Sequence, residues 1–174
     1  MTAAKTILMV ISPKMYRDEE FREPLAVFEK SGAAVTVVST VKGRAEGMLG
    51  DSYDIETTVD EVAERLYDAM VIVGGRGSAE HLWDHPTIHT MLQRHQAAGK
   101  VISGICLSAA TLAKAGTLTG HKATVFGRED AVEALKAGGA DYQVAPVVTD
   151  GKIVTGEGPK VATDFAKAIL AALG

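Results

Sequence analysis

Residues 101–115 read V-I-S-G-I-C-L-S-A-A-T-L-A-K-A, and this stretch decides the fold. Val101–Ile105 has the pattern of a buried strand, covered on both faces of a parallel sheet. Leu107–Ala115 continues as a helix of small residues. A strand that passes directly into a helix predicts an open, mostly parallel α/β sandwich, with Cys106 at the turn between the two elements.

Strand and helix patterns alternate on both sides of this stretch. Lys5–Ser12 is almost wholly apolar, Glu19–Ser31 has apolar residues at helical spacing, and Ala34–Thr40 is rich in β-branched residues. These three elements form a strand-helix-strand unit, whose connection is expected to be right-handed. The polar stretch Val41–Val59 is expected to form a loop or a short hairpin. The other predicted elements are strands at Ala69–Val73, His121–Phe126, Tyr142–Thr149 and Ile153–Thr155, and helices at Val62–Leu66, Pro86–Ala98 and Val161–Leu173.

The composition excludes several classes of protein. Of the 174 residues, 47% are hydrophobic and 23% are charged, which provides enough apolar material for one folded domain. The net charge of −4 argues against a nucleic-acid-binding protein, which needs a basic face. No apolar run approaches the ~20 residues of a membrane span, and the N-terminus lacks a signal-peptide pattern. The single cysteine excludes an internal disulfide, so we expect a cytoplasmic protein.

Gly104, Cys106 and Ser108 form a G-x-C-x-S pattern that is close to the G-x-S-x-G nucleophile elbow. In such an elbow a sharp turn lifts the nucleophile above the sheet, and small neighbours let the backbone and the helix approach closely. A thiol at a helix N-terminus lies near the positive end of the helix dipole, which is expected to lower its pKa. Because free cysteines are often simply buried, a structural role for Cys106 is the alternative.

A second strand end is expected beside this elbow, because ligands of open parallel sheets bind beyond the carboxyl ends of the strands. Residues 71–77 read V-I-V-G-G-R-G, and the backbone N–H groups of Gly74 and Gly75 could stabilise an oxyanion near the thiol. A phosphate loop is the competing interpretation. It is the weaker one, because Glu80 occupies the last position of the G-x-G-x-x-G pattern.

A third strand end leads into three consecutive acidic residues, Asp18, Glu19 and Glu20. Acidic side chains at the start of a helix complement the helix dipole and need no other role. One of these carboxyls could instead face the thiol and act as an acid or a base. Spacing alone does not distinguish the three.

Three histidines, His81, His85 and His89, are spaced by four residues, as metal ligands on one helix face would be. Pro86 interrupts the spacing, so the three are not expected to share a helix. We therefore predict no metal site, and we expect these side chains at the surface or at a contact between subunits.

Four segments, taken together, resemble the ThiJ/PfpI superfamily, which includes the parkinsonism-associated deglycase. The resemblance covers essentially the whole chain, as a single domain at residues 1–174. It implies a flavodoxin-like three-layer sandwich with a mostly parallel sheet, a homodimer or higher homo-oligomer, a small-molecule substrate and no cofactor. The segments are Y-R-D-E-E-F-R-E-P at 16–24, V-I-V-G-G-R at 71–76, S-G-I-C-L-S-A-A-T-L-A-K-A-G-T-L-T-G-H-K-A-T at 103–124 and V-T-D-G-K-I-V-T-G-E-G-P-K-V-A-T-D-F-A at 148–166.

The resemblance also assigns roles to particular residues. Cys106 matches the reactive thiol, and Glu20, four residues before Pro24, matches the glutamate that hydrogen-bonds this thiol. Gly75 and the amide of Leu107 match the oxyanion-stabilising backbone, with Gly74 alongside. The Gly158–Pro159 turn matches one that lines the pocket.

Two positions depart from the pattern of the superfamily. Peptidase-like members have a histidine directly after the nucleophile, where this chain has Leu107. Deglycase-like members have a histidine on the strand after the elbow helix, where this chain has Phe126. The absence of these two histidines weakens the peptidase interpretation most, because amide hydrolysis needs a general acid for the leaving amine.

The leading functional hypothesis is a cysteine-dependent enzyme on small reactive carbonyls, of the glyoxalase III or deglycase type. Cys106 is the expected nucleophile and Glu20 the expected proton shuttle. The alternative is a non-enzymatic, stress-protective redox sensor that works through oxidation of Cys106. An isocyanide hydratase and a cysteine peptidase or amidotransferase are further alternatives, and Leu107 counts against the hydratase.

Overall fold

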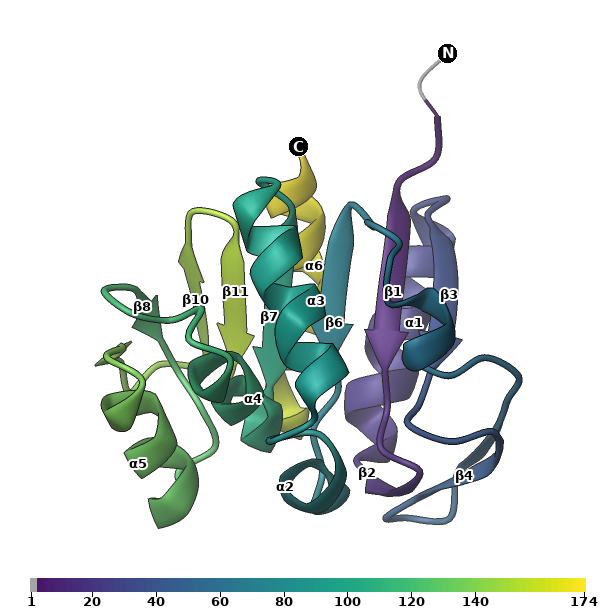
Figure 1. Ribbon diagram of the computed structural model, residues 1–174, viewed down its shortest axis with the longest axis horizontal. Helices are drawn as coiled ribbons and strands as arrows, with labels where there is room; N and C mark the ends of the chain where they lie inside the picture. The colour runs from purple at the N-terminus through teal and green to yellow at the C-terminus, as the bar shows by residue number, and fades with distance from the viewer. Residues whose placement is uncertain (1–2) are drawn as a thin grey trace.

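A six-stranded sheet forms the centre of the computed structural model, which describes residues 3–174 (Figure 1). The strand order is β10-β11-β7-β6-β1-β3, and every neighbouring pair is parallel except β10 with β11. The predicted, mostly parallel sheet is thereby confirmed. Its strands are β1 (Thr6–Val10), β3 (Ala34–Val38), β6 (Ala69–Ile72), β7 (Val101–Ile105), β10 (Val147–Asp150) and β11 (Ile153–Gly156).

Helices cover both faces of this sheet. The helices α1 (Asp18–Lys30) and α6 (Ala162–Leu173) pack together on one face, whereas α3 (Pro86–Ala97) and α4 (Ala109–Lys114) cover the other (Figure 1). Residues 7–10 of the inner strand β1 are fully buried, which explains why this strand is apolar on both sides. The result is the predicted three-layer α/β sandwich.

Several predicted elements are shorter than expected. The strand predicted at 121–126 is reduced to β8 (Lys122–Ala123), which pairs with β9 (Asp141–Tyr142) outside the main sheet. The segment after β8 instead crosses the carboxyl end of β7, where the amide of Phe126 donates to the carbonyl of Cys106 at 3.3 Å. The helix predicted at 62–66 is only a 3₁₀ turn at Asp60–Val62.

Short elements gather at the carboxyl edge of the parallel strands, which is the lower edge in Figure 1. Residues 41–59, predicted to form a loop or a short hairpin, contain two antiparallel strands, which join β2 in a second sheet. No helix in the described part of the chain combines the length and the apolar character that a bilayer crossing requires. The short elements are β2 (Lys14–Tyr16), β4 (Gly43–Gly47), β5 (Ser52–Ile55), α2 (Gly77–His81), the 3₁₀ turns Cys106–Ser108 and Pro159–Val161, and α5 (Glu129–Ala137).

Candidate active site

Cys106 lies at the turn between β7 and α4 with a backbone φ of +59°. A non-glycine residue in this left-handed region costs about 1–2 kcal/mol, so the surrounding structure must hold it there. Gly104 shows how tight the turn is, because a Cβ at this position would lie 2.8 Å from the carbonyl oxygen of Ser108. The backbone thus has the sharp turn predicted for a nucleophile elbow, and Cys106 as a residue is 7% exposed.

Of the three acidic residues at the start of α1, Glu20 is the one that faces the thiol. Its side chain is fully buried, and neither carboxyl oxygen has a hydrogen-bond partner of good geometry among residues 3–174. Gly74 separates the two groups. A Cβ on Gly74 would clash with Oε1 of Glu20 and would lie 2.8 Å from the Cβ of Cys106. The carboxyl and the thiol therefore meet across a position where only a glycine fits.

Burial controls the protonation of Glu20. It raises the pKa of this carboxyl to about 8, although the Cys106 side chain, the positive charge of Arg17 and the amide of Gly74 each act to lower it. A carboxyl with such a pKa keeps its proton at neutral pH. Glu20 can then donate a hydrogen bond to sulfur or to a substrate oxygen.

The expectation of a lowered thiol pKa is not met. Burial raises the pKa of Cys106 above its ordinary value, and the charge of an ionised Glu20 raises it further. The amides of Leu107 and Gly75 act in the opposite direction but do not outweigh burial. The helix dipole favours the thiolate, but desolvation disfavours any buried charge and outweighs the dipole here.

The two predicted oxyanion donors are held firmly in place. Gly75 has a φ of +111°, and a Cβ there would lie 2.5 Å from the amide nitrogen of Arg17, so the chain passes closely over this position. The carbonyl of Leu107 accepts a hydrogen bond from Nε1 of Trp83 at 2.8 Å, which fixes the peptide after the thiol. Both amides lie within hydrogen-bonding reach of the sulfur, where each acts to lower the pKa of the thiol.

A cavity of about 330 Å³ opens above the thiol. Five of the residues predicted from the sequence line it: Gly75, Cys106, Leu107, Phe126 and Pro159. Phe126 is 45% exposed and forms part of the wall. Glu20 and Gly74 lie next to Cys106 but do not line the cavity. Gly158 lies behind Phe126, where its Cβ would be 3.5 Å from Cδ2 of the ring, and it lines an adjoining hollow with Pro159.

Four further residues of the cavity were missed by sequence reasoning: Arg17, Met48, Arg76 and Arg128. Arg17 and Arg76 directly adjoin motifs that were singled out, so their position in the sequence was a usable signal. Met48 and Arg128 come from loops without any local motif, and only the fold brings them to the thiol.

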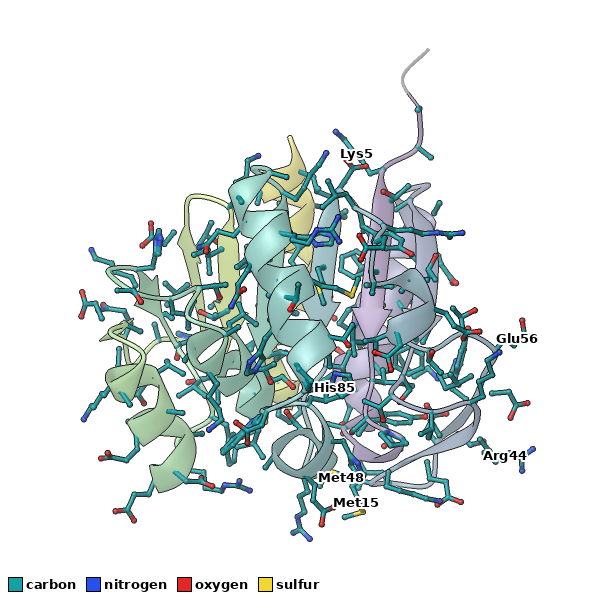
Figure 2. The ribbon with its side chains drawn as sticks, in the orientation of Figure 1. Lys5, Met15, Arg44, Met48, Glu56 and His85 are labelled. Carbon is teal, nitrogen blue, oxygen red and sulfur yellow. The ribbon has the colours of Figure 1, made fainter. Side chains whose placement is uncertain are left out.

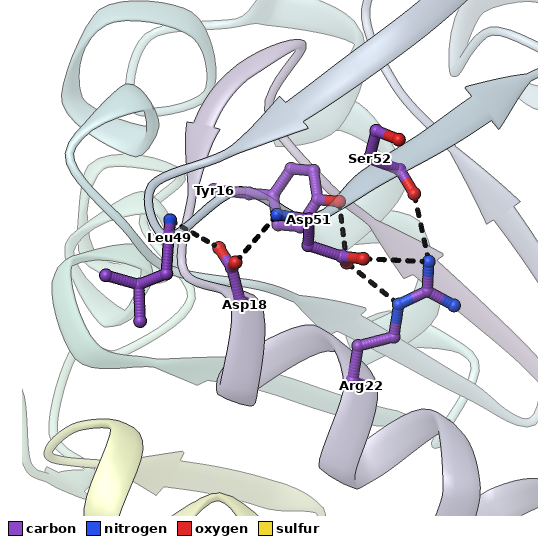
Figure 3. A network of polar contacts seen from close by, with 6 residues as sticks. All are labelled: Tyr16, Asp18, Arg22, Leu49, Asp51 and Ser52. Carbon is purple, nitrogen blue, oxygen red and sulfur yellow. Dashed lines mark hydrogen bonds and ion pairs between the residues drawn. The ribbon is translucent and has the colours of Figure 1, made fainter.

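A network of polar contacts holds the turn that carries Met48 (Figure 3). Asp18 accepts hydrogen bonds from the amides of Leu49 and Asp51, at 3.1 and 3.0 Å. Asp51 in turn accepts from the hydroxyl of Tyr16 at 2.8 Å and from Arg22 at 2.8 and 3.2 Å, and Arg22 also donates to the carbonyl of Ser52. Figure 2 shows Met48 at the lower edge of the molecule, below the parallel strands, and its amide donates to the carbonyl of Tyr16 at 2.8 Å.

The histidines do not belong to the cavity. His95 is buried in α3, where Nδ1 donates to the carbonyl of Met91 and Nε2 accepts from the amide of Tyr67. His89 is bonded to the carbonyl of Trp83 at 2.6 Å, and His85 precedes α3. Within residues 3–174, no three side chains of the metal-binding types come close enough together to hold a metal ion.

Comparisons with known proteins agree on one family. The family model described as DJ-1/PfpI matches residues 5–172. An uncharacterised protein of Methanocaldococcus jannaschii is 46% identical over 96% of this chain and 82% of its own length. A deglycase of Thermococcus kodakarensis is 29% identical over 87% of this chain and 90% of its own length. The crystal structure of a ThiJ/PfpI domain protein from Brachyspira murdochii matches with a TM-score of 0.90 and 32% identity, covering 99% of this chain and 98% of that one.

Proposed function

The chain belongs to the DJ-1/PfpI family, and from that membership we propose that it is a cysteine-dependent enzyme acting on small reactive carbonyl compounds. The observation that carries the proposal is the position of Cys106, on a strained turn beside the buried carboxyl of Glu20. A buried carboxyl without a hydrogen-bond partner weakens a fold, so its presence beside a thiol favours a chemical role. Relatives of moderate identity that are named deglycases give further support.

The first step is addition of the Cys106 sulfur to the carbonyl carbon of an aldehyde. A carbon–sulfur bond forms, the π bond of the carbonyl breaks, and the thiol proton must reach the new alkoxide. Glu20 is protonated at neutral pH, so one of its oxygens can donate to the alkoxide while the other accepts the thiol proton. The product is a hemithioacetal, and Glu20 ends the step protonated again.

The later steps convert a 2-oxoaldehyde such as methylglyoxal into a hydroxy acid. One oxygen of Glu20 takes the proton of the first carbon while its O–H gives a proton to the neighbouring ketone oxygen, which forms an enediol. Glu20 then protonates the second carbon and takes the hydroxyl proton of the first, which gives the thioester of lactate and leaves Glu20 protonated. Water then cleaves the thioester, which releases lactate and restores the thiol. The amides of Gly75 and Leu107 stabilise the oxyanions, and the loss of one such donor typically costs about 3 kcal/mol in the barrier.

This chemistry needs no histidine, and no histidine among residues 3–174 lines the cavity. The two positions at which the superfamily places a histidine are the cavity residues Leu107 and Phe126. Hydrolysis of an amide would require a general acid for the leaving amine. A cysteine peptidase or amidotransferase is therefore less well supported, and an isocyanide hydratase also has Leu107 against it.

The proposal is tested by the rate at which the protein converts methylglyoxal to lactate. We expect Cys106→Ser and Glu20→Gln each to lower kcat/KM at least ~100-fold, as the loss of a nucleophile or general acid does. Glu23→Gln is the matched control, because Glu23 is an exposed carboxyl on the same helix. Unchanged turnover in both site variants would refute the mechanism.

Redox sensing is the second candidate function, and the same pair of residues supports it. A protonated Glu20 can donate a hydrogen bond to a sulfinate formed on Cys106 and so stop oxidation at that stage. After mild peroxide treatment, intact mass should show the gain of two oxygens in the wild type. In Glu20→Gln we expect a mixture of oxidation states, and a wild-type thiol that stays unmodified would exclude this candidate.

We also propose that the protein forms a homo-oligomer and works in the cytoplasm. Phe126 and Leu49 expose much of their apolar surface near the cavity, and a second copy could cover them. The cytoplasm keeps a free thiol such as that of Cys106 reduced. Sedimentation equilibrium would test the first point, and a purely monomeric protein at micromolar concentration would exclude it.

A further inference from the structure

Three guanidinium groups surround the mouth of the cavity above Cys106, and none of them takes part in the mechanism described above. Arg17 precedes α1, Arg76 follows Gly75, and Arg128 precedes α5, so only the fold brings them together. We propose that this site selects carbonyl substrates that carry a carboxylate or a phosphate group. The inference rests on the proposed function, because it takes the Cys106 thiol as the reacting group.

Two of the guanidinium groups are oriented by carboxylates that do not line the cavity. Arg17 donates from Nε and Nη2 to Glu19 at 2.6 and 3.2 Å, and Arg128 donates from the same atoms to Asp130 at 2.6 and 2.9 Å. In both residues Nη1 has no protein acceptor among residues 3–174. The ion pairs thus offset part of the positive charge. They also hold each guanidinium in a fixed direction and leave its Nη1 N–H groups available to an anion.

Arg76 has no such partner. It is exposed, and within residues 3–174 it makes neither an ion pair nor a side-chain hydrogen bond. Its charge is therefore not offset by a nearby carboxylate. Arginine is the side chain best suited to a planar carboxylate or a phosphate, because its N–H groups fit two oxygens at once.

Further observations connect two of the arginines with the thiol. Hydrogen bonds to Glu19 and Asp130 are the main reason why the pKa values of Arg17 and Arg128 are raised, and the negative charge of a Cys106 thiolate adds to both. The guanidinium of Arg128 also lies 5.6 Å from the ring centre of Trp83, whose Nε1 holds the peptide of Leu107. The charges are thus close enough to act on a group bound at the sulfur.

The size and lining of the cavity limit the substrate. A volume of about 330 Å³ is at the low end for small-molecule sites. Leu107, Phe126 and Pro159 provide an apolar wall for a short carbon chain, whereas the arginines lie where an anionic end would bind. A compound of a few carbons, with an aldehyde or ketone at one end and an anion at the other, fits this arrangement.

A pair of alkylating reagents tests the anion site without any catalysis. Iodoacetate and iodoacetamide have nearly the same size. Each forms a bond between its CH2 carbon and the Cys106 sulfur, with loss of iodide and of the thiol proton, and leaves a carboxymethyl or a carbamoylmethyl group on the sulfur. Only iodoacetate carries a negative charge. We expect the ratio of its rate constant to that of iodoacetamide to exceed the same ratio for glutathione at least ~10-fold, and to fall as salt is added.

Variants of the arginines show which of them raises the ratio of the two rate constants. Arg76→Gln and Arg128→Gln should each bring the ratio several-fold closer to the glutathione value, and because both reagents use the same thiol, a change in thiol reactivity cancels. Arg44→Gln is the matched control, because Arg44 is an exposed arginine that does not line the cavity and should leave the ratio unchanged. A wild-type ratio equal to that of glutathione would overturn the proposal.

Reversible protection of the thiol distinguishes the two anions. Glyoxylate, glyceraldehyde 3-phosphate and the neutral compounds glyoxal and glyceraldehyde would each compete with alkylation by iodoacetamide. Stronger protection by glyoxylate than by glyoxal indicates a carboxylate substrate, and stronger protection by the phosphate than by glyceraldehyde indicates a phosphorylated one. Equal protection by anionic and neutral compounds would overturn the proposal, whereas failure of methylglyoxal turnover with a high iodoacetate ratio would refute only the proposed reaction.

Discussion

Asp18 and Glu20 lie two residues apart in the first turn of α1, yet their surroundings differ completely. Asp18 is partly buried, and each of its carboxyl oxygens accepts a hydrogen bond from a backbone amide. Glu20 is fully buried and lacks a hydrogen-bond partner of good geometry among residues 3–174. A satisfied carboxylate stabilises a fold, whereas an unsatisfied buried carboxyl weakens it. The difference separates a structural acid from one available for chemistry.

The same contrast extends to the neighbours of each residue. Around Asp18, the hydrogen bond from Arg22 holds the pKa of Asp51 below its usual range, so this carboxylate is charged and paired. Around Glu20, burial raises the pKa values of both Glu20 and Cys106, so both groups hold protons that can be transferred. One side of the start of α1 is thus a clamp for the β4–β5 turn, and the other is a reactive pair.

Two glycines offer the sharpest way to test this comparison. A Cβ on Gly74 would clash with Glu20, and a Cβ on Gly47 would clash with Asp18. We expect Gly74→Ala to displace the carboxyl or the thiol and to lower methylglyoxal turnover ~100-fold or more, since a shift of about 1 Å at a reacting group has that effect. Gly47→Ala should cost about 1–3 kcal/mol of stability through overpacking, with turnover nearly unchanged.

The measurements are steady-state kinetics and urea denaturation on both variants. The comparison fails if Gly47→Ala loses as much turnover as Gly74→Ala at equal folded fraction. The position of the Glu20–Cys106 pair would then depend on the contacts of Asp18 with the β4–β5 turn.

The sequence predicted the main sheet well, because its four inner strands are buried on both faces and their sequences are apolar runs. It did not predict β2, α2 or α5, each of which is short or polar, and it made the strand at 121–126 too long. That segment has strand-forming residues, but only Lys122 and Ala123 pair, with β9, and the rest of it crosses the end of β7.

The candidate site was predictable only in part. The elbow at Cys106 follows from local spacing, since strand and helix are both evident from the sequence. Local spacing does not show that Glu20, and not Asp18, faces the thiol. Successive helical residues point about 100° apart, so the way α1 packs on the sheet decides which carboxyl faces it. The arginine at position 128 could not have been found at all, because no local pattern marks a residue that only the fold brings to the cavity.

The raised pKa of Glu20 predicts a particular dependence of stability on pH. At low pH the carboxyl is protonated in both the folded and the unfolded chain. As the pH rises from 4.5, the unfolded chain loses its proton first, so the wild type should lose about 1.4 kcal/mol per pH unit up to a pH of about 8. Glu20→Gln should remove this loss and be more stable than the wild type at pH 8, even though it is inactive. Urea unfolding midpoints of both proteins between pH 4.5 and 8 measure this pH dependence of stability. If the midpoints of the two proteins change with pH in parallel, Glu20 is ionised in the folded protein.

The clamp should show the opposite dependence on pH, with a smaller effect. The pKa of Asp51 is lowered, so its contribution is complete above the unfolded value of 3.8 and is lost as the pH falls through the folded value. At neutral pH, Asp51→Asn should cost about 1–2 kcal/mol, because it weakens hydrogen bonds with Tyr16 and Arg22 that are partly exposed to solvent. Asp54→Asn is the control, since the Asp54 ion pair with Arg44 is long and exposed and should contribute under ~0.5 kcal/mol. Equal losses in thermal unfolding would mean that the clamp contributes no more than an ordinary surface ion pair, and Met48 would then be held over the cavity by the packing of the β4–β5 turn alone.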